Sequence, residues 1–176
     1  SLQLETCADL AEQQRPGLSD RLEQLVALSK QSLLEVRHYV FDLKPYLAGE
    51  KSAAGIVESQ VREFGSVAGV EAEVEVEGED REVHMVVSTC LYRATQEALA
   101  NVFKHARASQ VKVALEFSTD GVHLQVRDNG HGFDPDTGIP GNGLRNMRQR
   151  AEELGGSFSL ESAPGQGSSV TIRVPC

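Results

Sequence analysis

The feature that most constrains the fold is a change in the spacing of apolar residues near Pro45. Between residues 18 and 43, apolar and small residues recur at alternating steps of four and three, the heptad pattern of helices packed in a bundle. Pro45 ends this pattern, because a proline disfavours helical geometry in the residue before it. After Pro45, stretches in which apolar residues have helical spacing are mixed with stretches in which apolar and polar residues alternate strictly. The sequence therefore predicts a helical hairpin over residues 1–47 and a separate domain over residues 48–176.

Pro16-Gly17 divides the first segment into a short helix and a longer one. A heptad seam of this length cannot be covered within one hairpin, so the pattern favours a homodimer that forms a four-helix bundle through residues 1–44. The alternative is that the hairpin packs against its own second domain. Helical spacing is already present at Ser1, so we expect the chain to begin inside a helix.

The second segment contains several runs of strict alternation. Between Val70 and Glu77, valine or alanine alternates with glutamate, which predicts a strand with one acidic face at a sheet edge. Residues 111–117 and 122–126 flank a Thr-Asp-Gly turn and predict an antiparallel hairpin. The polar residues of these strands share one face, so helices are expected to cover only the other face.

The predicted fold class is α+β, a two-layer α/β sandwich preceded by the helical hairpin. Its sheet is expected to be mixed, mostly antiparallel, with helices on one face. The remaining expected elements are helices over residues 51–66, 81–106 and 143–154, with Asn142 as a cap of the last, and strands over residues 158–160 and 170–174.

Composition excludes several classes of protein. The net charge of −9 argues against a general nucleic-acid-binding protein, whose affinity depends on lysine and arginine. The three cysteines are far apart and form no C-x-x-C pair, so neither a disulfide framework nor a zinc site is indicated. No apolar run is long enough for a membrane span, and no signal-peptide pattern is present. We therefore expect a cytoplasmic segment, whether or not the parent protein is anchored to a membrane.

The first segment whose side chains could bind a ligand or take part in a reaction lies on the helix predicted over residues 81–106. Glu97 and Asn101 are four residues apart, with Lys104 and His105 one turn further, so all four are expected on one stripe. A carboxylate, an amide oxygen and a lysine suit a magnesium–phosphate group, because Mg²⁺ prefers oxygen ligands. Taken alone, the same pattern describes an ordinary polar helix face.

The second segment runs from Asp128 through Gly130 to Gly132, directly after a predicted strand. A buried carboxylate there could accept a hydrogen bond from the amino group of adenine, whereas guanine would leave it unpaired. The alternative is a simple hairpin turn, since Asn-Gly is a strong turn signal. No alternating strand follows Gly132, however, and the long loop that does follow is typical of a lid.

The third and fourth segments are rich in glycine. Gly141 and Gly143 precede a helix whose first amides could point at an anion. Residues 165–168, Gly-Gln-Gly-Ser, join two predicted strands and taken alone indicate only a turn. A phosphate-binding loop of the G-x-x-x-x-G-K-[ST] type is absent from the sequence, as is a dinucleotide-binding fingerprint.

In this order, the four segments resemble the ATP-binding fold shared by histidine kinases, gyrase-type topoisomerases, Hsp90 chaperones and mismatch-repair ATPases. Residues 96–106 resemble the asparagine box of the kinases, and residues 128–132 their first glycine box. Residues 141–156, with the Glu35-x-Arg37 and Asp-Leu-Lys-Pro motifs before residue 46, are similar to the sensor kinases that signal to nitrate-response-type regulators. The resemblance covers nearly the whole chain.

The resemblance implies a role for each matching residue. Asn101 would hold Mg²⁺, Asp128 would recognise adenine, and Glu97 would assist the acceptor histidine as a base or orienting group. The other implied nucleotide-binding residues are Lys104, His105, Gly130, Gly132, Gly141, Gly143, Leu144 and Ser168. Ser168 departs from the family pattern, which usually has threonine, but it retains the hydroxyl.

The resemblance also implies a phosphoacceptor histidine followed by an acidic residue on the first bundle helix. None of the five histidines has such a neighbour, and His38, the one histidine in the predicted hairpin, belongs to the second helix. We therefore expect the acceptor to precede Ser1 and residues 1–176 alone not to phosphorylate themselves.

The predicted function is that of the ATP-binding catalytic region of a two-component sensor histidine kinase, with ATP and Mg²⁺ as cofactors. The kinase would transfer the γ-phosphoryl group of ATP to a histidine for relay to a response regulator, here a DNA-binding nitrate-response type. One alternative is an ATP-hydrolysing conformational switch of the same fold. The other is a non-catalytic interaction module with a degenerate pocket, against which the intact Asn101, Asp128 and glycines argue.

Overall fold

The structure is a computed structural model that describes residues 52–135 and 142–176, together with Leu22 and Leu25. Leu22 and Leu25 are both helical. The chain divides into two units, residues 1–44 and residues 45–176. Apart from Leu22 and Leu25, the predicted hairpin and its dimer interface lie outside the described residues, and so does Gly141.

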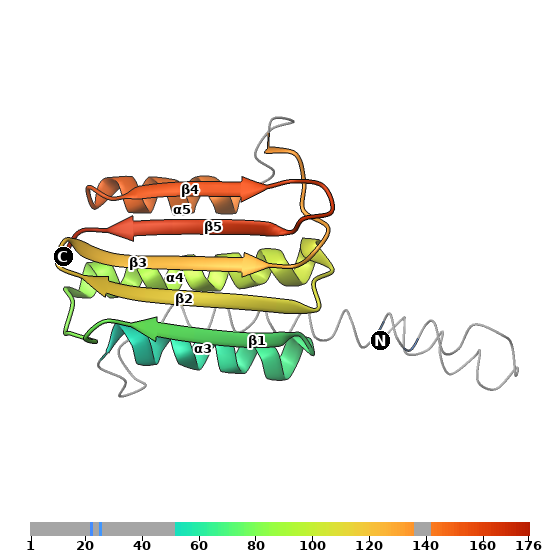
Figure 1. The fold of residues 1–176 in the computed structure, drawn as a ribbon, viewed down its shortest axis with the longest axis horizontal. Coiled ribbons are helices and arrows are strands. Elements are labelled where there is room, and N and C mark those ends of the chain that lie inside the picture. Colours follow the sequence, from blue (N-terminus) through green and yellow to red (C-terminus); the bar gives the residue numbers. More distant parts are fainter. Residues whose placement is uncertain (1–21, 23–24, 26–51, 136–141) are drawn as a thin grey trace, which may run out of the picture. The chain divides into compact units, whose positions relative to one another are not determined.

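A five-stranded sheet forms the frame of the second unit (Figure 1). Its spatial order is β1-β2-β3-β5-β4. β1 pairs with β2 in parallel, and the other three pairings are antiparallel, which confirms the predicted mixed, mostly antiparallel sheet. The strands are β1 (Glu71–Glu77), β2 (Gln110–Ser118), β3 (Gly121–Asp128), β4 (Ser157–Ser162) and β5 (Ser168–Val174).

Three helices cover one face of this sheet (Figure 1). α3 packs against β1, α4 against β3 and β5, and α5 against β4 and β5. Alternation within the strands sends their apolar residues toward the helices, and the most completely buried include Leu115, Leu124 and Ile172. The helices are α3 (Ala53–Ala68), α4 (Met85–Asn101) and α5 (Asn142–Glu153). The two-layer sandwich is therefore confirmed.

Local signals explain where α3 and β1 begin and end. The hydroxyl of Ser52 accepts a hydrogen bond from the amide of Gly55 at 3.1 Å, and Gly69 ends the helix in the left-handed conformation. The glutamates of β1 are exposed at the sheet edge, as the alternation predicts, and Glu73 forms an ion pair with Lys112 of β2 at 3.0 Å.

The helix predicted over residues 81–106 differs from the prediction at both ends. α4 begins only at Met85, because residues 79–82 are all charged and exposed and have no apolar stripe to bury. Its continuation, η1 (Val102–Ala106), is a π-helix and ends at Arg107, which has a positive φ of 52°. A π turn inside a helix is rare and frequently lies at a functional site.

Asn142 also differs from the expected cap. It is the first residue of α5, and its side-chain oxygen accepts a hydrogen bond from the Arg145 guanidinium at 2.9 Å rather than from a backbone amide. The helix boundary thus lies one residue earlier than predicted.

Candidate functional site

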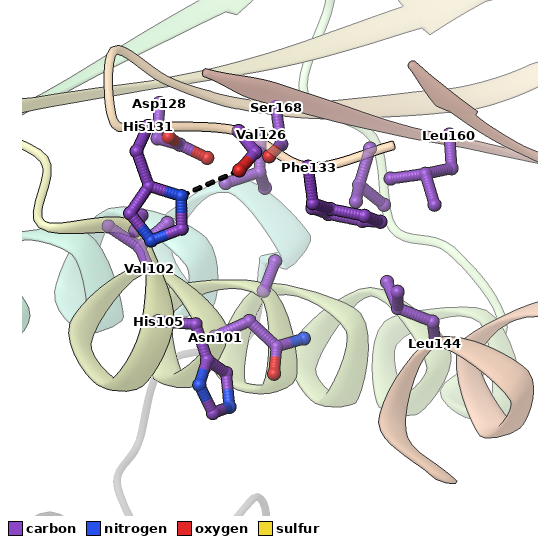
Figure 2. Close-up of a pocket in the computed structure, with 14 residues that line it drawn as sticks. Asn101, Val102, His105, Val126, Asp128, His131, Phe133, Leu144, Leu160 and Ser168 are labelled. Atoms are coloured by element: carbon purple, nitrogen blue, oxygen red, sulfur yellow. Dashed lines mark hydrogen bonds between the residues drawn. The ribbon is translucent and has the colours of Figure 1, made fainter. Parts of the chain in front are cut away.

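A cavity of about 420 Å³ opens between the helical layer and the end of β3 (Figure 2). This volume lies within the range of small-molecule sites, and the walls are mainly apolar with a few polar groups, as such sites usually are. The lining residues are Ala98, Asn101, Val102, His105, Ala106, Val126, Asp128, His131, Gly132, Phe133, Leu144, Leu160, Ser168 and Val170.

Asp128 is the buried carboxylate of this cavity. It is the last residue of β3, is only 6% exposed, and lies opposite Ser168 in the register with β5. One of its oxygens accepts a hydrogen bond from the amide of Gly130 at 2.8 Å. Burial raises the pKa of this carboxyl, opposed by hydrogen bonds from Gly130 and Ser168 and by the charge of His131. The position therefore suits a ligand that donates a hydrogen bond.

Asn129 fixes the backbone after β3, although sequence reasoning treated it only as a turn residue. Its side-chain oxygen accepts hydrogen bonds from the amides of Ser109 and Gln110, both at 3.0 Å, and its amide group donates to the hydroxyl of Ser109 at 2.9 Å. The signal was an asparagine directly after a strand, where its side chain can satisfy neighbouring backbone groups.

The glycines near Asp128 are required by close packing. A Cβ at Gly130 would collide with the carbonyl oxygen of Ala106, and one at Gly132 would collide with that of Ala163. Gly132 also has a positive φ of 58°, which favours glycine. Gly167, with a φ of 73°, lies directly over the Asp128 carbonyl. The two glycine turns, residues 130–132 and 165–167, thus interlock beside the carboxylate.

The four polar residues predicted to share one helix face do not all reach the cavity. Asn101 and His105 line the cavity opposite Asp128 (Figure 2), whereas Glu97 and Lys104 do not. Because a π turn holds more residues than an α turn, Lys104 lies further round the helix from Asn101 than an α-helix would place it. Lys104 is exposed.

Glu97 lies against the start of α5 rather than in the cavity. A Cβ at Gly143 would collide with the Glu97 carboxylate, so the two helices meet here because residue 143 has no side chain. Gly143 is not among the residues that line the cavity, and its role in nucleotide binding stays a prediction. The next residue, Leu144, is 6% exposed and does line it.

The structure brings together six of the eleven predicted site residues as lining of one cavity: Asn101, His105, Asp128, Gly132, Leu144 and Ser168. Gly130, Gly143, Glu97 and Lys104 lie outside the lining, and Gly141 outside the described residues. The functional role of each remains a prediction. The sequence did not identify the apolar residues that line the cavity, among them Phe133 and Leu160. Apolar residues follow the same pattern in a sequence whether they line a cavity or fill the core.

The chain matches the family of histidine kinase-, DNA gyrase B- and HSP90-like ATPases over residues 86–176, more than half of its 176 residues. The matched region includes every residue that lines the cavity. The chain belongs to this ATPase family. The recognition made from the asparagine and glycine boxes is therefore confirmed at the level of the family.

Curated relatives of this ATPase domain include the sensor protein VraS of Staphylococcus epidermidis and of Staphylococcus aureus. Each is 30% identical over 161 residues, covering 91% of this chain and 46% of the relative. The chain therefore spans about half the length of these relatives. They support the recognition of a sensor kinase ATPase domain, but the nitrate-sensor subfamily stays a prediction.

Solved structures share the fold of this ATPase domain. The histidine kinase domain of the blue-light-activated kinase from Erythrobacter litoralis aligns with a TM-score of 0.56 at 21% identity, covering 85% of this chain and 74% of that one. The ATP-binding domain of PrrB from Mycobacterium tuberculosis aligns with a TM-score of 0.54 at 22% identity, covering 72% and 98%.

Among residues 52–135 and 142–176, no three His, Cys, Asp or Glu side chains gather as a group that could hold a metal ion. None of the described helices combines the length and apolar character needed to cross a membrane.

Proposed function

We propose that this ATPase domain binds ATP in the described cavity and that the whole protein is a sensor histidine kinase. The kinase transfers the γ-phosphoryl group of ATP to a histidine, from which a response regulator receives it. The observation that carries this proposal is the buried Asp128 carboxylate at the end of β3, facing Asn101 and His105 of the helix across a largely apolar cavity.

Asp128 is the group proposed to recognise the base. An ionised carboxylate only accepts hydrogen bonds, so it pairs with the exocyclic amino group of adenine and not with the carbonyl of guanine at the same position. Val126, Leu160 and Val170 supply apolar surface around the carboxylate, on which the flat base can pack. Burial strengthens the discrimination, because an unpaired polar group in such a site costs about 1 to 3 kcal/mol.

Asn101 and His105 form the proposed phosphate end. Asn101 offers one amide oxygen to the cavity, which fits a Mg²⁺ ion that takes its other ligands from phosphate oxygens and water. The ion would neutralise charge on the phosphates during transfer.

Further parts of the proposal concern the whole protein. Glu97 acts on the acceptor histidine as a base or orienting group, residues 1–44 form the homodimer, and the response regulator is of the nitrate-response type. Glu97 would act from its place beside the start of α5, where its carboxylate lies against Gly143.

Titration calorimetry tests the binding step. The 176-residue chain is expected to bind ATP with micromolar to millimolar affinity in the presence of Mg²⁺ and to bind GTP more weakly. Binding should weaken when EDTA removes the magnesium. Equal affinities for ATP and GTP would contradict the assignment of the base site.

A further inference from the structure

The hydroxyl of Ser162, the last residue of β4, contacts Phe133, Gly167 and Ser168 beside the cavity. Its hydroxyl accepts a hydrogen bond from the amide of Phe133 at 2.9 Å and donates one to the carbonyl of Gly167 at 3.0 Å. The hydroxyl of Ser168 lies 3.1 Å away. Ser162 is half-buried and does not itself line the cavity.

Two of these contacts have a fixed hydrogen-bond direction. A serine hydroxyl has one proton to donate and two lone pairs that accept. The Ser162 hydroxyl donates its proton to the carbonyl oxygen of Gly167, because a carbonyl can only accept. One lone pair of the hydroxyl accepts the hydrogen bond from the Phe133 amide. The hydroxyl of Ser168, which also forms a hydrogen bond with Asp128, lies 3.1 Å from the Ser162 hydroxyl.

The partners of Ser162 lie on both sides of the base-binding end, Phe133 in the loop after β3 and Gly167 and Ser168 where β5 begins. Phe133 lines the cavity and follows the first glycine turn. Gly167 packs on the carbonyl of Asp128, and Ser168 is the register partner of Asp128 on β5. One side chain therefore joins the loop after β3, the turn between β4 and β5, and the neighbour of the buried carboxylate.

We propose that Ser162 is a positioning residue for nucleotide binding. It holds Phe133, Gly167 and Ser168 at the spacing that shapes the base-binding end around Asp128, and it does so without touching the nucleotide. The proposal rests on the proposed function, since it assumes that the base binds beside Asp128. The competing explanation is that the hydroxyl only satisfies local backbone groups of a turn.

The test compares Ser162→Ala, which removes the hydroxyl, with Ser162→Thr, which keeps it. Ser159→Ala is the matched control, because Ser159 lies on the same strand but is exposed on the opposite face. Calorimetry with the full chain should give about a tenfold loss of affinity for Ser162→Ala, since two or more hydrogen bonds are lost. Adenosine should lose as much affinity as ATP, because the defect lies at the base end. Ser162→Thr should regain most of the affinity, and Ser159→Ala should match the wild type.

Hydrogen exchange without nucleotide separates this proposal from the proposed function. Ser162→Ala should speed exchange of the Phe133 amide by about tenfold, and Ser162→Thr should restore its protection. If the wild type bound no ATP, the proposed function would fail, while unchanged exchange at Phe133 would overturn the role of Ser162 independently. Wild-type affinity in Ser162→Ala, or an equal loss in Ser159→Ala, would also overturn it.

Discussion

At the scale of single residues, Asp128 combines a charge with a largely apolar environment. Burial raises its pKa from the ordinary value of 3.8, so the folded protein binds a proton at this carboxyl more tightly than the unfolded chain does. The stability contributed by protonation is therefore lost as the pH rises from about the ordinary value through the raised pKa. Above that window the ionised carboxylate imposes a constant cost on the empty domain.

Asp128→Asn should remove this cost while preserving the shape of the side chain. Its remaining oxygen can still accept the hydrogen bond from Gly130. The free energy of unfolding at neutral pH, measured by urea denaturation without nucleotide, should therefore rise, and its dependence on acid pH should weaken. A variant that is less stable than the wild type at pH 7 would show that the ionised carboxylate stabilises the domain instead.

The Glu97 side chain lies against Gly143, in space that a side chain at position 143 would occupy. Gly143→Ala adds helix propensity, which favours the folded domain, and a methyl group that must displace the flexible end of Glu97, which costs free energy. In a Glu97→Ala background the same substitution should cost less, giving a coupling on the order of 1 kcal/mol in chemical denaturation. Additive effects of the two substitutions would mean that the contact carries no energy.

At the scale of elements, the interlocked glycine turns hold the end of β3 against the turn between β4 and β5. Gly132→Ala combines a positive φ with a collision against backbone carbonyls and should cost roughly 3 kcal/mol of unfolding free energy. Gly165→Ala is the matched control, since Gly165 has a φ of 79° but open space around it, and it should cost about 1 kcal/mol. Similar losses would show that the collision is relieved by local movement.

The elements themselves were largely predictable from the sequence, because alternation and helical spacing are local signals. The β2–β3 hairpin and the acidic edge strand β1 follow directly from such patterns. The π turn at Val102–Ala106 was not predictable, since the same residues would also fit an α-helix. The π turn places Lys104 further round the helix from Asn101 than an α-helix would.

The site was predictable in part for a different physical reason. Asp128, Asn101 and Ser168 carry polar groups whose chemistry is visible in sequence, and the resemblance placed them together. The contact of Gly143 with Glu97 depends on how α5 packs on α4, which no local pattern encodes. The same applies to Ser162, whose partner Phe133 lies 29 residues away in the sequence.

At the scale of the whole molecule, nucleotide binding and phosphoryl transfer are expected to separate. Transfer requires the donor and acceptor atoms within about 3 to 3.5 Å of each other. None of the five histidines has the acidic neighbour expected of the acceptor. Incubation of the chain with γ-labelled ATP should therefore give no acid-labile phosphate. Robust labelling that His38→Gln abolishes would contradict this expectation and identify His38 as the acceptor.

The central claim is that this cavity selects adenine through Asp128, and the ratio of ATP to GTP affinity tests it most directly. Calorimetry should give a ratio of about ten or more for the wild type, since an unpaired buried carboxylate costs about 1 to 3 kcal/mol. In Asp128→Asn the ratio should fall toward one, because the asparagine amide can also donate to the guanine carbonyl. An Asp128→Asn variant that binds ATP as tightly as the wild type, with the ratio unchanged, would contradict the claim.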